Sequence, residues 1–174
     1  MEQIWNQTLG EPKTSIQRDL YMNLTKLMSE SSLEAKERYL NLLALSQTLK
    51  FQAFVNHSEE ELKKLELSDE QILEAKESAG IMGMLNTYYK FKSYLPASVS
   101  ESCSRAGLRM QSLMKPSNGK ELFEQMAFSV SVVNGCPSCI ASHEEALRKA
   151  GTSTDKIHDL ARLASVMKGV QALL

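Results

Sequence analysis

Two cysteines with redox spacing stand in the C-terminal part of the chain. Cys136 and Cys139 form a C-x-x-C pair, and His143 follows four residues after the second cysteine. Gly135 before the pair and Pro137 inside it indicate the end of one helix and the first turn of the next. Cys136 is therefore expected at or near a helix N-cap, where free backbone N–H groups and the helix dipole favour a thiolate. From this position the pair can close a disulfide across the first helical turn.

A histidine and a glutamate could form a proton relay with this pair. A spacing of four residues places His143 on the same helical face as Cys139, close enough to exchange a proton directly or through one water. Upstream, Glu124 stands in a largely apolar segment, residues 122–133, where a buried carboxylate needs a partner. His143 is the obvious partner. We expect Glu124 to orient His143, and His143 to take the thiol proton.

Three alternatives compete with redox chemistry at these residues. The pair and its histidine could be half of a zinc site, but tetrahedral zinc needs four ligands, and the sequence has no second C-x-x-C and no H-x-x-H. We therefore expect no bound metal. The cysteines could be buried and inert, which their redox spacing around a proline disfavours. Glu124 could also be a solvated helix residue.

The elements that must position these residues are predicted to be helices. The 174 residues include only 8 Gly and 4 Pro, and Leu, Met, Ala, Glu, Lys and Gln fill the long segments. Capping-box patterns begin at Ser31, Ser58 and Ser68, and Asn118 with Glu121 has the same layout. With apolar spacing of three and four, these signals predict an all-α chain with helices at residues 13–29, 32–49, 58–66, 69–93, 98–114, 119–134, 137–149 and 154–172.

An internal repeat with a period of about 85 residues predicts two related helical lobes. The segment from His57 to Ile72 resembles the segment from His143 to Ile157, with one insertion or deletion. The clearest turn cluster between the halves is residues 116–119. We therefore expect a single domain, residues 1–174, with an N-terminal lobe at 1–115 and a C-terminal lobe at 116–174 that carries the C-x-x-C pair. Chance similarity between two helices rich in Lys and Glu is the alternative.

Composition argues against several classes of protein. The 20 basic and 21 acidic residues give a formal net charge of -1 without a basic stripe, so nucleic acid is not an expected partner. No stretch approaches the roughly 18 to 20 apolar residues of a membrane helix, and the N-terminus lacks a secretory signal, so we expect a soluble, cytoplasmic protein. An odd number of cysteines does not fit a disulfide framework, and Cys103 is expected to be a half-buried bystander.

The spacing of Glu124, Cys136, Cys139 and His143 resembles the E-x11-C-x-x-C-x3-H signature of the alkyl hydroperoxide reductase D (AhpD) family, within the carboxymuconolactone decarboxylase superfamily. The strict resemblance covers residues 121–162, while length and repeat suit the whole chain. It implies an all-α fold of two related lobes, of which only the C-terminal one is catalytic. It also implies a homo-oligomer, a trimer or a hexamer.

The activity that the resemblance implies is that of a thiol-dependent peroxidase acting on hydrogen peroxide or alkyl hydroperoxides. No cofactor would be bound. Electrons would come from a lipoylated protein or another external dithiol, and could pass to a partner peroxiredoxin. In the family, the cysteine equivalent to Cys139 attacks the peroxide and becomes a sulfenic acid, the one equivalent to Cys136 resolves it to a disulfide, and Glu124 and His143 would form the proton relay.

Two features depart from the family pattern or from its assignment of roles. Well-studied members carry a histidine between the two cysteines, where this chain has Ser138, a change that bears on the efficiency of the relay and on the order of attack. The N-cap position favours Cys136 as the more acidic thiol. We follow the family assignment of Cys139, because His143 is one helical turn from Cys139 and two from Cys136.

The N-terminal lobe is expected to be redox-silent, because Lys50 and Ala53 stand near the places where cysteines would fall in the repeat. Two other functions remain open. One is lactone decarboxylation of the kind found in the same superfamily, which needs no thiols and against which the dithiol argues. The other is a non-catalytic dithiol redox sensor.

Overall fold

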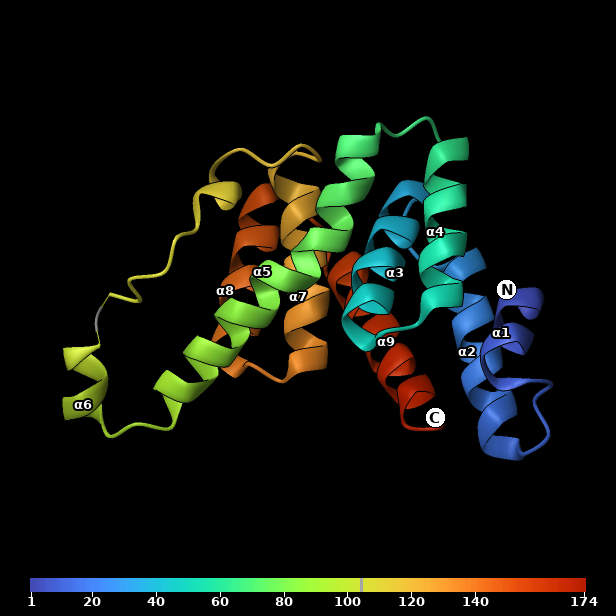
Figure 1. Cartoon of the computed structure of the whole chain (residues 1–174), viewed down its shortest axis with the longest axis horizontal. Helices are drawn as coiled ribbons and strands as arrows, with labels where there is room; N and C mark the ends of the chain where they lie inside the picture. Colours follow the sequence, from blue (N-terminus) through green and yellow to red (C-terminus); the bar gives the residue numbers. More distant parts are fainter. Residues whose placement is uncertain (104) are drawn as a thin grey trace.

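The computed structural model describes residues 1–103 and 105–174 and is all-helical, which confirms the predicted fold class (Figure 1). No strand occurs in these two ranges. The elements are α1 (Glu2–Leu9), α2 (Ser15–Glu30), α3 (Ala35–Leu49), α4 (Gln52–Lys64), α5 (Asp69–Ser93), α6 (Ala97–Ser102), the 3-10 helix η1 (Gln111–Met114), α7 (Lys120–Asn134), α8 (Pro137–Ala150) and α9 (Thr154–Gln171).

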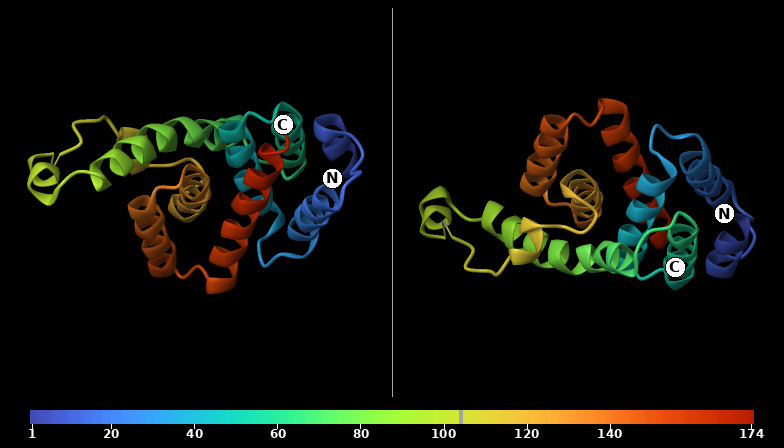
Figure 2. Two further views of the ribbon diagram at one scale, coloured as in Figure 1. Left: turned by 90° about the horizontal axis from the view of Figure 1, so that it is seen from below. Right: turned by 90° about the horizontal axis from the view of Figure 1, so that it is seen from above.

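Helix α7 lies at the centre of the C-terminal part and packs against α3, α5, α8 and α9. Figure 2 shows α7 nearly end-on with α5, α8 and α9 around it. Helix α2 packs on α9, and α1 packs on α4. The C-terminal end of α5 and the short α6 project from the body at the left of Figure 1. No helix in the described ranges is both long and apolar enough to cross a membrane.

The core explains why α3 and α7 are the inner helices. Leucines occupy every side of the short helix α3. All four of its central leucines are fully buried: Leu40, Leu42, Leu43 and Leu45. Leu40 and Leu43 pack with Met126, Ala127 and Val130 of α7, and Leu42 and Leu45 pack in a second core with residues of α2 and α9. Each buried leucine contributes on the order of 1.5 to 3 kcal/mol to folding. A helix that is apolar all round is stable only when its neighbours cover it, as they do here.

The helices repeat along the chain. Helices α3, α4 and α5 begin at residues 35, 52 and 69, and α7, α8 and α9 begin at 120, 137 and 154, so each pair of starts differs by 85 residues. The turns match as well: Lys50 (φ 65°) after α3 and Gly135 (φ 63°) after α7 are both left-handed. Two equivalent backbone bonds close these turns, from Phe51 to Ser46 O (2.9 Å) and from Cys136 to Ser131 O (3.2 Å). The division at residues 115 and 116 stays a prediction.

The constant spacing corrects three details of the predicted repeat. The counterpart of His143 is Ser58, one residue after the predicted His57. The counterparts of the two cysteines are not Lys50 and Ala53 but the buried residues Phe51 and Phe54. No insertion separates the two sets of helices, so the single-residue offset of the histidines is a difference of sequence alone.

Five of the predicted helices agree with the structure to within about two residues, and the helix at 69–93 agrees at both ends. A sixth, predicted at 32–49, begins three residues later. Its cap is Glu34, whose backbone N–H donates to Glu37 Oε2 at 2.7 Å, so the predicted cap at Ser31 is wrong. The Ser68 cap is confirmed: its hydroxyl accepts from the backbone N–H of Gln71.

Two other predicted caps are wrong. The helix predicted at 58–66 begins at Gln52, and the Ser58 hydroxyl lies inside it and donates to Phe54 O at 2.8 Å. Phe54 is fully buried, and the core contacts of this segment extend the helix toward its N-terminus. The cap of α7 is Gly119, and the side-chain amide of Asn118 instead donates to Glu74 Oε2 at 2.8 Å.

The helix predicted at 98–114 is the largest error. The structure has α6, then a non-helical segment and η1, and residue 104 lies outside the described residues. Gly107 is left-handed (φ 66°), which interrupts a right-handed helix. Met110 and Leu113 face the core around α5. Helix α1 was not predicted, although Trp5 at its centre is fully buried.

Candidate active site

The C-x-x-C pair lies where α7 ends and α8 begins. Gly135 ends α7 in the left-handed conformation, Cys136 is the N-cap of α8, and Pro137 follows at the first helical position. Cys136 and Cys139 are joined by a disulfide with a Cα–Cα distance of 5.3 Å, within the usual range for such bonds. This is the disulfide across the first turn that the spacing predicts. Local sequence is sufficient to place both sulfurs.

Packing of α7 against α8 brings the predicted glutamate and histidine together. His143 Nδ1 lies 2.6 Å from Glu124 Oε2, and each side chain is about one-fifth exposed (19% and 20%). A carboxylate bonded to one ring nitrogen fixes the orientation of the imidazole and leaves the other ring nitrogen, Nε2, available for proton transfer. Glu124 is thus not a freely solvated helix residue. The geometry suits a base that is held in place for proton transfer.

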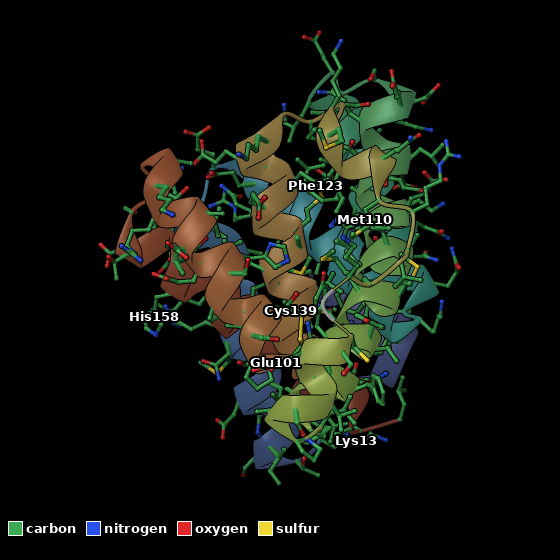
Figure 3. All side chains as sticks on the ribbon, turned by 90° about the vertical axis from the view of Figure 1, so that its left-hand side faces the viewer. Lys13, Glu101, Met110, Phe123, Cys139 and His158 are labelled. Atoms are coloured by element: carbon green, nitrogen blue, oxygen red, sulfur yellow. A yellow bond between two sulfur atoms is a disulfide. The ribbon has the colours of Figure 1, made fainter. Side chains whose placement is uncertain are left out.

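Cys139 and His143 line the same cavity, which has a volume of about 420 Å³. The opposite wall comes from α5 and from the segment before α7, and is largely apolar, with Asn86 as a polar residue in it. Figure 3 looks onto this side of the molecule and labels Cys139 on α8 and Met110 on the segment before α7. The apolar side chains of this wall are Met82, Leu85, Tyr89, Met110 and Leu113.

The two sulfurs differ in access. Cys139 is 7% exposed and lines the cavity, whereas Cys136 is fully buried. Ser138, which stands where well-studied members of the resembling family carry a histidine, places its hydroxyl 3.7 Å from Cys136 Sγ. Ser138 therefore contacts the first sulfur and also lines the cavity that His143 shares with the second.

The α5 side of the site was not predicted from the sequence. Met82, Tyr89 and Met110 pack against the core, and they also form part of the cavity wall opposite Cys139. No local signal could have found them, because α5 is about 50 residues from the cysteines and its register against α8 depends on tertiary packing.

The third cysteine and the two other histidines do not line the cavity of Cys139. Cys103 is half-buried, as expected. His57 is half-buried with its ring 5.8 Å from that of Tyr39, and burial lowers the pKa of its imidazole. His158 is exposed and lies on the outer face of α9, away from Cys139 (Figure 3). Within the described ranges, no three His, Cys, Asp or Glu side chains gather in a way that would hold a metal ion.

The chain is similar to a known protein family and to individual known proteins. The model of the carboxymuconolactone decarboxylase family matches residues 108–174, which include the cysteine pair, Glu124 and His143. Proteins named alkyl hydroperoxide reductase AhpD are similar over most of the chain. The protein from Mycolicibacterium smegmatis is 35% identical over 158 residues, covering 90% of this chain and 88% of the relative. Those from Nocardia farcinica and Streptomyces coelicolor are 35% and 34% identical over 153 and 157 residues, covering 88% and 90% of this chain and 84% and 87% of the relatives.

Proposed function

Because the chain belongs to the carboxymuconolactone decarboxylase family and is similar over most of its length to proteins named alkyl hydroperoxide reductase AhpD, we propose that it is a thiol-dependent peroxidase that reduces hydrogen peroxide or alkyl hydroperoxides. One observation carries the proposal. Cys139 lines a largely apolar cavity together with His143, and His143 is held by Glu124. A thiol, a base and a group that orients the base are the parts that an activated sulfur nucleophile needs.

In the proposed oxidative half-reaction, His143 takes the proton of the Cys139 thiol, and the thiolate attacks one oxygen of the hydroperoxide. The O–O bond breaks, Cys139 becomes a sulfenic acid, and the alcohol leaves with the proton that His143 held. The Cys136 thiol then attacks the Cys139 sulfur and displaces its hydroxyl group, which leaves as water. The dithiol has lost two electrons and the hydroperoxide has gained them.

Exposure supports Cys139 as the sulfur that meets the hydroperoxide, in agreement with the order that the family resemblance implies. A substrate in the cavity can reach Cys139, but Cys136 is fully buried. The N-cap position of Cys136 does not contradict this order, because a helix N-terminus favours the thiolate that a resolving cysteine also needs.

The reductive half-reaction requires an external dithiol, and the proposal names a lipoamide-type group, on a lipoylated protein or another donor. A donor thiolate would attack Cys139, the more accessible sulfur, and Cys136 would leave as a thiolate. The second donor thiol would then release Cys139. No bound cofactor takes part, and a peroxiredoxin could receive the electrons in place of a hydroperoxide.

A homo-oligomer, trimeric or hexameric, belongs to the same proposal. The projecting end of the molecule supports it, because Phe91 and Tyr94 at the end of α5 and Val99 in α6 are 51%, 76% and 45% exposed. Apolar side chains that gather at one exposed end commonly mark an interaction surface.

The test is consumption of cumene hydroperoxide with dihydrolipoamide as the donor. Wild type should turn over repeatedly, Cys139→Ser should lose the activity, and Cys103→Ser should keep it as the matched control. Equal rates in wild type and Cys139→Ser would contradict the proposal. Loss of two thiols per hydroperoxide without turnover by the dithiol would favour a redox sensor, and lactone turnover that survives thiol alkylation would favour a decarboxylase.

A further inference from the structure

Helix α5 holds the end of α7 through a set of side-chain hydrogen bonds beside the cysteines. Asn86 Nδ2 donates to Ser131 Oγ at 2.9 Å, and Asn134 Nδ2 donates to Asn86 Oδ1 at 2.9 Å. One turn further along α5, Lys90 Nζ donates to the backbone oxygen of Asn134 at 3.3 Å. Asn86 and Ser131 are buried. We call these four residues the α5 clamp.

The α5 clamp acts on the backbone that leads directly to Cys136. The last carbonyl groups of a helix lack partners within the helix, and Lys90 supplies one for Asn134, the last residue of α7. The ammonium group also faces the next residue, since a Cβ placed on Gly135 would lie 3.8 Å from Lys90 Nζ. The Cys136 N–H then donates to Ser131 O at 3.2 Å. The clamp therefore contacts the turn and adds a positive charge beside it.

The other half of the repeat provides an internal comparison. With the constant spacing of 85 residues, Ser46, Leu49 and Gln171 correspond to Ser131, Asn134 and Asn86. Gln171 Nε2 reaches Leu49 O at 3.4 Å, and the buried Ser46 hydroxyl has no hydrogen-bond partner among the described residues. This half has phenylalanines in place of the cysteines and keeps one long bond of the clamp.

Both turns nevertheless have the same backbone conformation, with φ of 65° at Lys50 and 63° at Gly135. The full clamp is thus not needed to form the turn. The full set of clamp hydrogen bonds occurs in the half that carries the cysteines and not in the other half.

We propose that Asn86 and Lys90 are positioning residues for the Cys136 sulfur, and that the Lys90 ammonium stabilises the reduced pair by favouring a thiolate at Cys136. The inference rests on the dithiol couple of the proposed function but not on its peroxide chemistry. In that couple, Cys136 attacks the Cys139 sulfenic acid and later leaves when a donor attacks Cys139. A stabilised thiolate raises the reactive fraction in the first step and improves the leaving group in the second.

The test measures the equilibrium between the Cys136–Cys139 disulfide and dithiothreitol at fixed pH, by alkylation of free thiols and without peroxide. Lys90→Met keeps the aliphatic chain and removes the charge and the donor. It should lower the equilibrium constant for reduction about tenfold, which corresponds to roughly 30 mV. Lys90→Arg should restore most of the wild-type value. The matched control is Gln171→Met, which removes the counterpart bond in the half without cysteines and should leave the constant unchanged.

Asn86→Leu, which is similar in size, should slow closure of the disulfide by tenfold or more when the reduced protein is mixed with oxidised glutathione instead of a hydroperoxide. If this variant does not fold, Lys90→Met decides the matter, because residue 90 is only half-buried and the substitution should be tolerated. A wild-type equilibrium constant in Lys90→Met, or an equal shift in Gln171→Met, would overturn the inference. A shifted constant in a protein that does not reduce hydroperoxides would keep the clamp and refute the proposed function instead.

Discussion

Glu124 and His143 meet at 2.6 Å in a setting that is partly shielded from water. A hydrogen bond between a carboxylate and an imidazole is stronger there than on an open surface, because water competes less for both groups. The imidazole also gains a fixed orientation toward the cavity that Cys139 lines. At the scale of single residues, the proposed mechanism needs Glu124 to hold His143, not to touch the substrate.

Glu124→Gln keeps the size of the side chain and removes its charge. We expect kcat/KM for cumene hydroperoxide to fall about a hundredfold, the usual magnitude for lost general acid–base assistance. Helix content by circular dichroism should not change. Glu144→Gln is the matched control, because it removes a carboxylate from α8 that pairs with Arg148 at the surface. Wild-type kcat/KM in Glu124→Gln would contradict the positioning role.

Residue-scale chemistry was predictable from sequence where it depends on local spacing. Cys136, Cys139 and His143 lie on one helix, so the C-x-x-C-x3-H pattern places them without tertiary information. The contact of Glu124 with His143 could be proposed because a carboxylate in an apolar segment needs a partner. Asn86 and Lys90 could not be found in this way, since nothing near them in sequence indicates that they meet Asn134.

At the scale of elements, the two left-handed turns after α3 and α7 differ in the residue that occupies them. Gly135 adopts a φ of 63° without steric cost, whereas Lys50 at 65° places a Cβ where L-residues are disfavoured by roughly 1 to 2 kcal/mol. The same turn therefore has a different energetic cost in each half. The half that carries the cysteines has the relaxed version.

One substitution at each of the two turn positions tests these energetic costs. Gly135→Ala should destabilise the protein by about 1 kcal/mol through backbone strain, because the added Cβ meets only Lys90 Nζ, at an ordinary contact distance. Lys50→Gly should stabilise the protein by a similar amount or slightly less, since glycine also loses more entropy on folding. Urea unfolding followed by circular dichroism measures both. Changes of the same sign in the two variants would contradict this account of the turns.

Element boundaries were predictable where capping signals and core contacts agree. Ser68 caps α5, which begins and ends as predicted. The prediction for residues 98–114 failed because Met110 and Leu113 show apolar spacing that serves the cavity wall rather than a helical face. Helix α4 begins earlier than its apparent cap, because the buried Phe54 makes core contacts that a sequence pattern does not reveal.

At the scale of the whole molecule, an ion pair between a buried carboxylate and a half-buried lysine connects the two halves. Lys156 of α9 lies 2.8 Å from Glu37 of α3, and Gln125 of α7 donates to the same carboxylate at 2.7 Å. Burial raises the pKa of Glu37, but hydrogen bonds from Lys156, the Glu34 N–H and Gln125 outweigh it, so the pKa lies below its usual value. Central packing of α7 thus depends on a charged contact as well as on apolar burial.

The lowered pKa of Glu37 determines how the free energy of unfolding changes as the pH falls. Unfolded Glu37 has the ordinary value of 4.5 and binds a proton more readily than the folded protein does. Its stabilising contribution is therefore complete above pH 4.5 and is lost as the pH falls through the lower folded value. Burial also raises the pKa of Asp159, but hydrogen bonds from Ser32 and Arg162 outweigh it, so the pKa lies below its usual value of 3.8. The stabilising contribution of Asp159 is therefore also lost as the pH falls below 3.8.

Glu37→Gln should lower the free energy of unfolding at pH 7 by about 2 kcal/mol, the magnitude of a lost hydrogen bond to a charged group. It should also flatten the decline in stability below pH 4.5. Urea midpoints measured between pH 3 and pH 7 test both effects. Glu101→Gln, at an exposed site in α6, is the control and should keep the wild-type profile. An acid profile in Glu37→Gln as steep as that of wild type would contradict the assignment.

The central claim is that Cys139 is the sulfur that reacts with the hydroperoxide and Cys136 the one that resolves it. Cys136→Ser treated with one equivalent of cumene hydroperoxide cannot form the disulfide, so its sulfenic acid should persist and react with dimedone. Peptide mapping by mass spectrometry should find the dimedone adduct on Cys139, at a rate of formation far above that of any adduct in Cys139→Ser. An adduct that forms on Cys136 in Cys139→Ser at least as fast as one forms on Cys139 in Cys136→Ser would contradict the claim.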